Sequence, residues 1–147
     1  MMDSLPDLLL MIHLASTLFM TGVIWFVQVV HYPLFSMIGR SVFPACEVRH
    51  AALTARIVGS PMLVELATAL LLFWIRPAEV STWNMSIGLA LLIVIWLSTA
   101  LVQVPCHQAL KRGFGAAVHQ RLVRTNWVRT VAWSLRGLLV CWMAYGY

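Results

Sequence analysis

The 147-residue chain is 61% hydrophobic and only 10% charged, and its mean hydropathy is +0.86. These values are far more apolar than those of soluble domains of this size, so we expect the chain to reside in a lipid bilayer. The formal net charge of +5 requires no nucleic acid as a partner, because basic loops facing anionic lipid head groups account for it.

Four apolar stretches are long enough to cross the hydrocarbon core, which takes about 20 residues of helix. They cover residues 8–30, 51–75, 83–104 and 127–145. The first and third contain no charged residue, whereas the second contains Arg56 and Glu65 and the fourth contains Arg129 and Arg136. Because a helix satisfies its own backbone hydrogen bonds in lipid, the sequence predicts an all-α, integral membrane four-helix bundle. Residues 1–147 are expected to form a single domain.

Basic residues are divided unevenly between the loops. The loops after the first and third spans hold Arg40, Arg49, Lys111, Arg112, Arg121 and Arg124. The opposite side holds Asp3, Asp7, Glu79 and a lone arginine, Arg76. Since short cytoplasmic loops retain an excess of Lys and Arg, both long loops are expected in the cytoplasm and both termini on the outer side of the membrane. The acidic N-terminal residues argue against a cleavable signal peptide.

Four of the five histidines lie where an apolar span meets a long loop. They are His31, His50, His107 and His119. An even number of spans brings all these junctions to the cytoplasmic face. Imidazole is a common ligand of transition metals and of haem iron, so these four histidines are candidate metal ligands. For any single one, an ordinary interfacial histidine that hydrogen-bonds to water, head groups or backbone is the simpler interpretation.

A polar seam runs along the first span. His13 and His31 point in the same direction but lie about 27 Å apart along the helix axis, so they cannot share one metal ion. Thr17, Thr21 and Gln28 fall near that same direction. A polar seam in lipid is expected to face the interior of the bundle.

Glu65 of the second span is expected near the middle of the bilayer, on the same face of the helix as Thr54. An ionised, unpaired carboxylate is costly there, so Glu65 is expected to be protonated, paired, or both. The candidate partners are His13, Arg136 and Arg56, and depth favours the first two.

Polar side chains from the third and fourth spans approach the same cytoplasmic region. Gln103 and His107 lie on one helical stripe, and Asn126 lies beside Arg129. If the protein binds haem, Arg129 or Arg136 is expected to pair with an anionic group such as a propionate. The candidate cofactor- or substrate-binding residues are His13, Gln28, Glu65, Gln103, Asn126, Arg129 and Arg136.

The first half of the chain resembles a known family. The first span reads LLLMIHLASTLFMTGVIWF, HYPLF follows it, and the second span contains ARIVGSPMLVELATALLLF. These segments resemble the HemJ-type membrane protoporphyrinogen oxidases, which share LH…W…G, YLPRLF and RI…P at similar places in a four-span bundle. The resemblance implies a haem b protein of the bacterial inner membrane, with His13 as the proposed axial ligand. The family's third-span lysine has no counterpart between Trp83 and Val104.

Two classes of function follow. In the first, haem b or another transition metal is bound by histidines and supports redox chemistry on a membrane-soluble substrate, with a redox partner or a second copy of the chain as further partners. In the second, there is no cofactor, and the polar seam with Glu65 serves a small transporter or holds together the helices of a membrane assembly subunit. Either His13 or the cytoplasmic histidines could be the functional centre.

Overall fold

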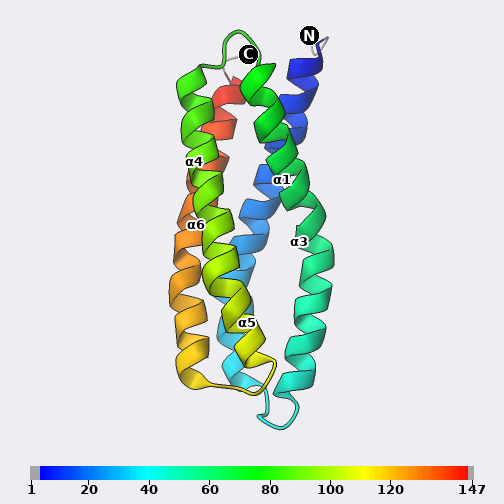
Figure 1. Ribbon diagram of the computed structural model, residues 1–147, viewed down its shortest axis with the longest axis vertical. Coiled ribbons are helices and arrows are strands. Elements are labelled where there is room, and N and C mark those ends of the chain that lie inside the picture. Colours follow the sequence, from blue (N-terminus) through cyan, green and yellow to red (C-terminus); the bar gives the residue numbers. More distant parts are fainter. Residues whose placement is uncertain (1–3, 146–147) are drawn as a thin grey trace.

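The computed structural model describes residues 4–145, and these are 87% helical with no strand among them. Four long helical rods run side by side in alternating directions (Figure 1). The first rod is α1 (Leu5–Phe26), continued by the π-helical η1 (Val27–His31), the single turn α2 (Tyr32–Leu34) and η2 (Phe35–Met37). The second rod is α3 (Phe43–Trp74). The third combines α4 (Thr82–Ser98), the π-helical η3 (Thr99–Gln103) and α5 (Val104–Leu110), and the fourth is α6 (Ala116–Tyr145).

Each predicted span lies inside one of these rods, apart from Ile75, which directly follows α3, and this confirms the all-helical, four-helix prediction. The rods extend beyond the predicted spans, since α3 already begins at Phe43 and α6 at Ala116. Three rods are long and apolar enough to cross a membrane, namely Leu5–Met37, Phe43–Trp74 and Thr82–Leu110. The fourth rod is equally long, but its arginines make it less apolar.

Local signals explain where the helices begin and end. Pro6 and Pro44 lie in the first turns of α1 and α3, where a missing backbone N–H costs nothing. The side chain of Ser81 accepts a hydrogen bond of 3.2 Å from the backbone N–H of Asn84 and caps α4. Gly113 adopts a φ of 151°, which side chains disfavour, and so permits the short connection from α5 to α6.

The bundle has two distinct ends, to which we give fixed names. The terminal end is where α1 begins and α6 ends (Figure 1). The basic end, opposite, carries the two loops between the rods (Figure 1). Arg40, Lys111 and Arg112 lie in these loops, and Arg49, Arg121 and Arg124 lie in the adjoining turns of α3 and α6.

Three apolar clusters make up the core along the bundle axis. Leu10, Leu72 and Val140 lie in the cluster at the terminal end, and Met20, Ile95 and Trp133 lie in the middle one. Tyr32, Phe35, Phe43, Cys106, Leu110 and Leu122 form the cluster at the basic end. Large apolar side chains also cover the outside of the bundle, as Trp74 and Leu138 illustrate at 82% and 70% exposed. Such a surface is the reverse of a soluble protein's and suits contact with lipid.

Prolines shape the rods. α3 bends near its middle (Figure 1), where Gly59 and Ser60 precede Pro61, and a proline ring clashes with the carbonyl four residues earlier. The two π-helical segments each end two residues before a proline, Pro33 after η1 and Pro105 after η3. The bend carries the first half of α3 away from its neighbours.

Candidate functional site

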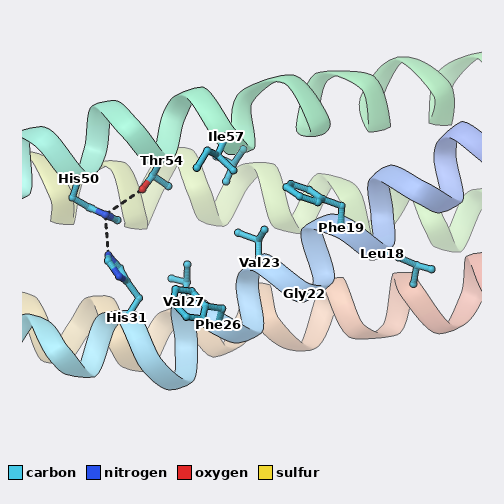
Figure 2. A pocket seen from close by; sticks show the side chains of 11 residues that line it. Leu18, Phe19, Gly22, Val23, Phe26, Val27, His31, His50, Thr54 and Ile57 are labelled. Carbon is cyan, nitrogen blue, oxygen red and sulfur yellow. Dashed lines mark hydrogen bonds between the residues drawn. The ribbon is translucent and has the colours of Figure 1, made fainter.

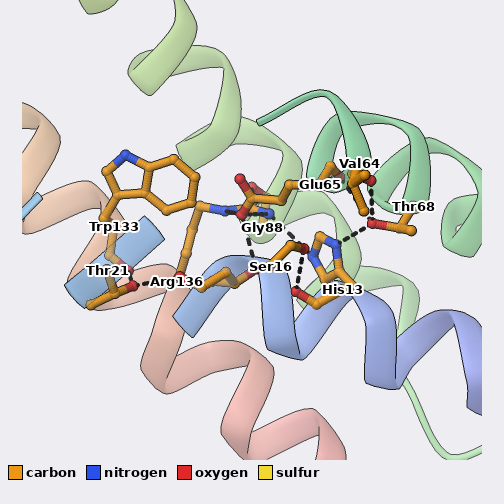
Figure 3. Close-up of polar contacts among 10 residues, drawn as sticks. His13, Ser16, Thr21, Val64, Glu65, Thr68, Gly88, Trp133 and Arg136 are labelled. Atoms are coloured by element: carbon orange, nitrogen blue, oxygen red, sulfur yellow. Dashed lines mark hydrogen bonds and ion pairs between the residues drawn. The ribbon is translucent and has the colours of Figure 1, made fainter. Parts of the chain in front are cut away.

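Inward-facing polar side chains form separate clusters at different depths of the bundle. We call the first the mid-bundle cluster, made of His13, Thr17, Glu65, Thr68 and Arg136 (Figure 3). The second is the histidine cluster at the basic end, made of His31, Tyr32, Glu47, His50 and His107. An amide network around Gln28 and Asn126 lies between them.

The mid-bundle cluster is built on a buried ion pair. Nε and Nη2 of Arg136 each lie 2.9 Å from Oε1 of Glu65, and both residues are almost completely buried at 1% and 0% exposed. Thr17 donates its hydroxyl to the same carboxylate oxygen at 2.9 Å, and Nη1 of Arg136 donates to the carbonyl of Gly88. The cluster therefore joins all four rods, because these residues come from α1, α3, α4 and α6. The predicted pairing of Glu65 with Arg136 is confirmed, whereas Arg56 is exposed.

Both ring nitrogens of His13 are engaged. Nε2 lies 3.2 Å from Nη2 of Arg136, and Nδ1 lies 2.8 Å from the hydroxyl of Thr68. Because a guanidinium can only donate hydrogen bonds, Nε2 of His13 accepts one from Arg136, and its Nδ1–H donates one to Thr68. The hydroxyl of Thr68 in turn donates a hydrogen bond to the carbonyl oxygen of Val64. Both ring nitrogens of His13 are thus occupied, which leaves none for iron. His13 also lines none of the three cavities that adjoin the histidine cluster. This arrangement does not fit the axial ligand implied by the resemblance.

The histidine cluster brings together three of the four predicted interfacial histidines. Nε2 of His31 lies 2.9 Å from Nδ1 of His50, and the hydroxyl of Thr54 lies 3.1 Å from that same nitrogen (Figure 2). The rings of His50 and His107 follow with their centroids 5.6 Å apart. His119 joins through the backbone, since its Nε2 lies 2.8 Å from the carbonyl oxygen of Tyr32. The prediction that these histidines gather at one end of the bundle is confirmed.

A carboxylate, an imidazole and a phenol form a chain within this cluster. Oε1 of Glu47 lies 2.6 Å from Nδ1 of His107, and Nε2 of His107 lies 3.0 Å from the hydroxyl of Tyr32. Glu47 is buried at 1% exposed, and its Oε2 has no hydrogen-bond partner among the described residues. A carboxylate that accepts from Nδ1–H leaves Nε2 as a proton acceptor directed at the phenol.

Glu47 and Tyr32 were not among the site residues predicted from the sequence. The available signals were Glu47 three residues before His50, on the same helical face, and Tyr32 directly after His31. Within residues 4–145, no three His, Cys, Asp or Glu side chains are grouped so that they could hold a metal ion. His31 and His50 instead bond to each other.

The amide network depends on the π-helical segments. Gln28 in η1 accepts a 2.9 Å hydrogen bond from Nδ2 of Asn126, whose Oδ1 accepts one of 3.2 Å from Nη1 of Arg129. Gln103 in η3 donates to the hydroxyl of Thr125 at 3.3 Å. The predicted site residues Gln28, Asn126 and Arg129 are thus connected, and Gln103 is joined to α6 separately, through Thr125.

Three cavities adjoin the histidine cluster, and His50 lines all of them. The α1–α3 cavity has a volume of about 540 Å³ and is lined by His31, Thr54 and apolar side chains such as Phe19 (Figure 2). The α3–α4 cavity has a volume of about 510 Å³. A smaller cavity of about 420 Å³ lies beside Glu47. All three flank the half of α3 that bends away from the bundle.

The α3–α4 cavity combines an apolar wall with a polar end. Its apolar wall includes Val58, Met62, Leu63 and Trp96. Its polar end is formed by Tyr32, His50, Gln103, His107, Gln108, Lys111 and Arg129. This division matches an elongated molecule with an apolar body and a polar head.

No family model, curated protein or solved structure shows significant similarity to the chain.

Proposed function

We propose that the chain is a multi-pass protein of the bacterial inner membrane that crosses the bilayer four times, with both termini on the outer side. The apolar outer surface supports this proposal. The arginines of α6 do not oppose it, because Arg129 and Arg136 point inward while Val131, Leu135 and Leu138 face outward. The basic loops at one end are consistent with the cytoplasmic excess of Lys and Arg.

Within this frame, we propose that the protein binds a membrane-soluble amphiphile in the α3–α4 cavity and exchanges a proton with its polar head. The observation that carries this proposal is the Glu47–His107–Tyr32 chain, which ends on the cavity wall. Glu47 holds His107 in the tautomer whose Nε2 accepts a proton, and the hydroxyl of Tyr32, which also lines the cavity, bonds to that nitrogen. A proton taken from a bound hydroxyl passes to the Tyr32 oxygen as the Tyr32 proton passes to His107.

Proton exchange with a lipophilic ring compound is one half of a redox reaction. Oxidation of a hydroquinone-type head releases protons and electrons together, and the Glu47–His107–Tyr32 chain takes up a proton. The electrons require an acceptor, which is a bound haem or transition metal or a separate one-electron redox partner. We therefore favour a membrane oxidoreductase over a transporter, since Glu65 is enclosed in the mid-bundle cluster and serves to join helices.

A haem or metal at the histidine cluster is the second part of the proposal. Nε2 of His50 makes no hydrogen bond within the described residues, and His50 also lines the two cavities that the amphiphile does not occupy. His50 would supply a nitrogen ligand to the iron, and the haem, when bound, would supply one-electron transfer. An absorption spectrum and metal analysis of the purified protein test this part. Absence of both a Soret band and stoichiometric iron or copper would leave a separate redox partner as the acceptor.

Quinone titration tests the binding site directly. A decyl-tailed benzoquinone is added to the protein in nanodiscs of neutral lipid, and the fluorescence of Trp96 is obtained as the difference between the wild type and Trp96→Phe. We expect saturable quenching. Tyr32→Phe removes one hydrogen bond worth about 1 kcal/mol, so the apparent affinity should fall about fivefold.

Tyr145→Phe is the matched control, because it also removes a phenolic hydroxyl, but from an exposed side chain at the terminal end. Its affinity should equal that of the wild type. Quenching that rises in proportion to quinone without saturating, or equal affinities for Tyr32→Phe and Tyr145→Phe, would refute the proposed site.

A further inference from the structure

The guanidinium of Arg129 is buried at the polar end of the α3–α4 cavity without an anionic partner. Arg129 is 8% exposed and lines this cavity. Its Nη1 donates to the neutral side-chain oxygen of Asn126, and its Nε is buried with no hydrogen-bond partner among residues 4–145. A buried cation without a counter-charge is costly, which calls for an explanation.

The neighbouring acids are already committed elsewhere. Glu65 pairs with Arg136, and Glu47 pairs with His107. Arg136, two turns further along α6, therefore has the carboxylate partner that Arg129 lacks. The same helix provides one arginine neutralised inside the protein and another that faces a cavity.

The cavity itself has an excess of positive charge. Lys111 and Arg129 line it, together with the neutral amides of Gln103 and Gln108, and no Asp or Glu among the described residues does so. The planar guanidinium fork matches the two oxygens of a carboxylate or phosphate, and such charge-assisted bonds are stronger than neutral ones.

We propose that the amphiphile bound in the α3–α4 cavity carries an acidic group, a carboxylate or a phosphate, that pairs with Arg129. Its apolar body lies along Val58, Met62 and Leu63, and Lys111 adds charge at the same end of the cavity. This inference rests on the proposed function, since it concerns the same cavity, and it narrows the ligand from amphiphiles in general to anionic ones.

Brominated ligands with matched tails test the charge requirement. Dibromostearic acid, its methyl ester and dibromostearyl phosphate are added at pH 8.5 to the protein in nanodiscs of neutral lipid. Bromine quenches Trp96, which lines the cavity, and Trp96→Phe supplies the background. A charged hydrogen bond contributes about 1.5–3 kcal/mol, so at least one anionic ligand should bind more tightly than the ester by roughly tenfold or more. The stronger of the two identifies carboxylate or phosphate as the preferred group.

Arg129→Gln should abolish the preference for the anion. Arg124→Gln is the matched control, because it removes the same charge from an exposed position of the same helix. Equal binding of acid, phosphate and ester by the wild type, or a preference that survives Arg129→Gln, would overturn the inference and leave the proposed site intact. If no ligand, including the quinone, quenches Trp96 saturably, the proposed function itself fails. If Arg129→Gln does not fold, the wild-type comparison of the anionic ligands with the ester still tests the inference. A reduced preference for the anion in Lys111→Gln would then support it.

Discussion

At the scale of single residues, the partners of a side chain distinguish structural from functional polarity. Glu65 and Arg136 neutralise each other in the interior, and Thr17 and His13 complete their hydrogen bonds. A buried ion pair adds little net stability over apolar residues, but removal of one member leaves an uncompensated charge. The mid-bundle cluster therefore specifies how the helices pack, while polar groups that face cavities remain free to act on a ligand.

Glu65→Leu should destabilise the protein strongly because Arg136 would lose its counter-charge. We expect the free energy of unfolding, measured by denaturant titration in mixed micelles, to fall by about 4 kcal/mol. The double variant Glu65→Leu/Arg136→Met should recover most of this loss. Arg56→Gln, an exposed change on the same helix, should alter stability little. If the double variant is less stable than Glu65→Leu alone, the ion pair is not the cause.

At the scale of elements, the π-helical segments position the glutamines and histidines. A π turn closes its hydrogen bonds over five residues instead of four, so it holds one extra residue without rotating the chain beyond it. Both segments contain the residue four positions before a proline, Val29 before Pro33 and Leu101 before Pro105. The wider turn accommodates a carbonyl that would otherwise clash with the proline ring.

Deletion of Val29 should convert η1 into a regular α turn and keep the residues on either side in register. We expect a folded protein of lower stability, since the clash with Pro33 returns. A short bismaleimide should still cross-link His31→Cys to His50→Cys in a background without other cysteines.

Deletion of Phe19 is the matched control, because it removes an exposed residue from a regular turn of α1. It rotates the preceding part of α1 by about 100°, which must break either the mid-bundle or the histidine cluster. This variant should give no monodisperse protein. Loss of the cross-link on deletion of Val29 would show that η1 does not carry an extra residue.

At the scale of the whole molecule, four antiparallel rods place every loop-facing histidine at the basic end. The same arrangement puts the start of α1 and the end of α6 together at the terminal end (Figure 1). If the basic end faces the cytoplasm, the histidine cluster and the polar end of the α3–α4 cavity lie close to that surface. A proton taken from the bound ligand there would be released to the cytoplasmic side.

Cysteine labelling tests this orientation. In a cysteine-free background, Ala78→Cys marks the terminal end and Ala117→Cys the basic end, and both alanines are exposed. A membrane-impermeant maleimide applied to spheroplasts should label Ala78→Cys within minutes and Ala117→Cys only after the membrane is opened. The reverse pattern would invert the topology, and labelling of both would exclude four complete crossings.

The sequence by itself determined the helical class, the four rods and the end at which the histidines gather. Hydrophobic length fixes helices, and an even number of antiparallel rods fixes which junctions meet, so neither requires knowledge of side-chain contacts. Depth along the helix was likewise enough to propose Arg136 as a partner of Glu65.

Only the tertiary structure decided which polar groups pair and which face a cavity. Helical spacing gives the direction of a side chain on its own helix, but not the rotation of that helix against its neighbours, which packing sets. Hence Glu47 and Tyr32 were missed, His13 proved to be fully hydrogen-bonded, and two arginines of α6 with similar surroundings in sequence acquired different partners. The cavities lie beside the half of α3 that precedes Pro61, and their other walls come from helices that are distant in the sequence.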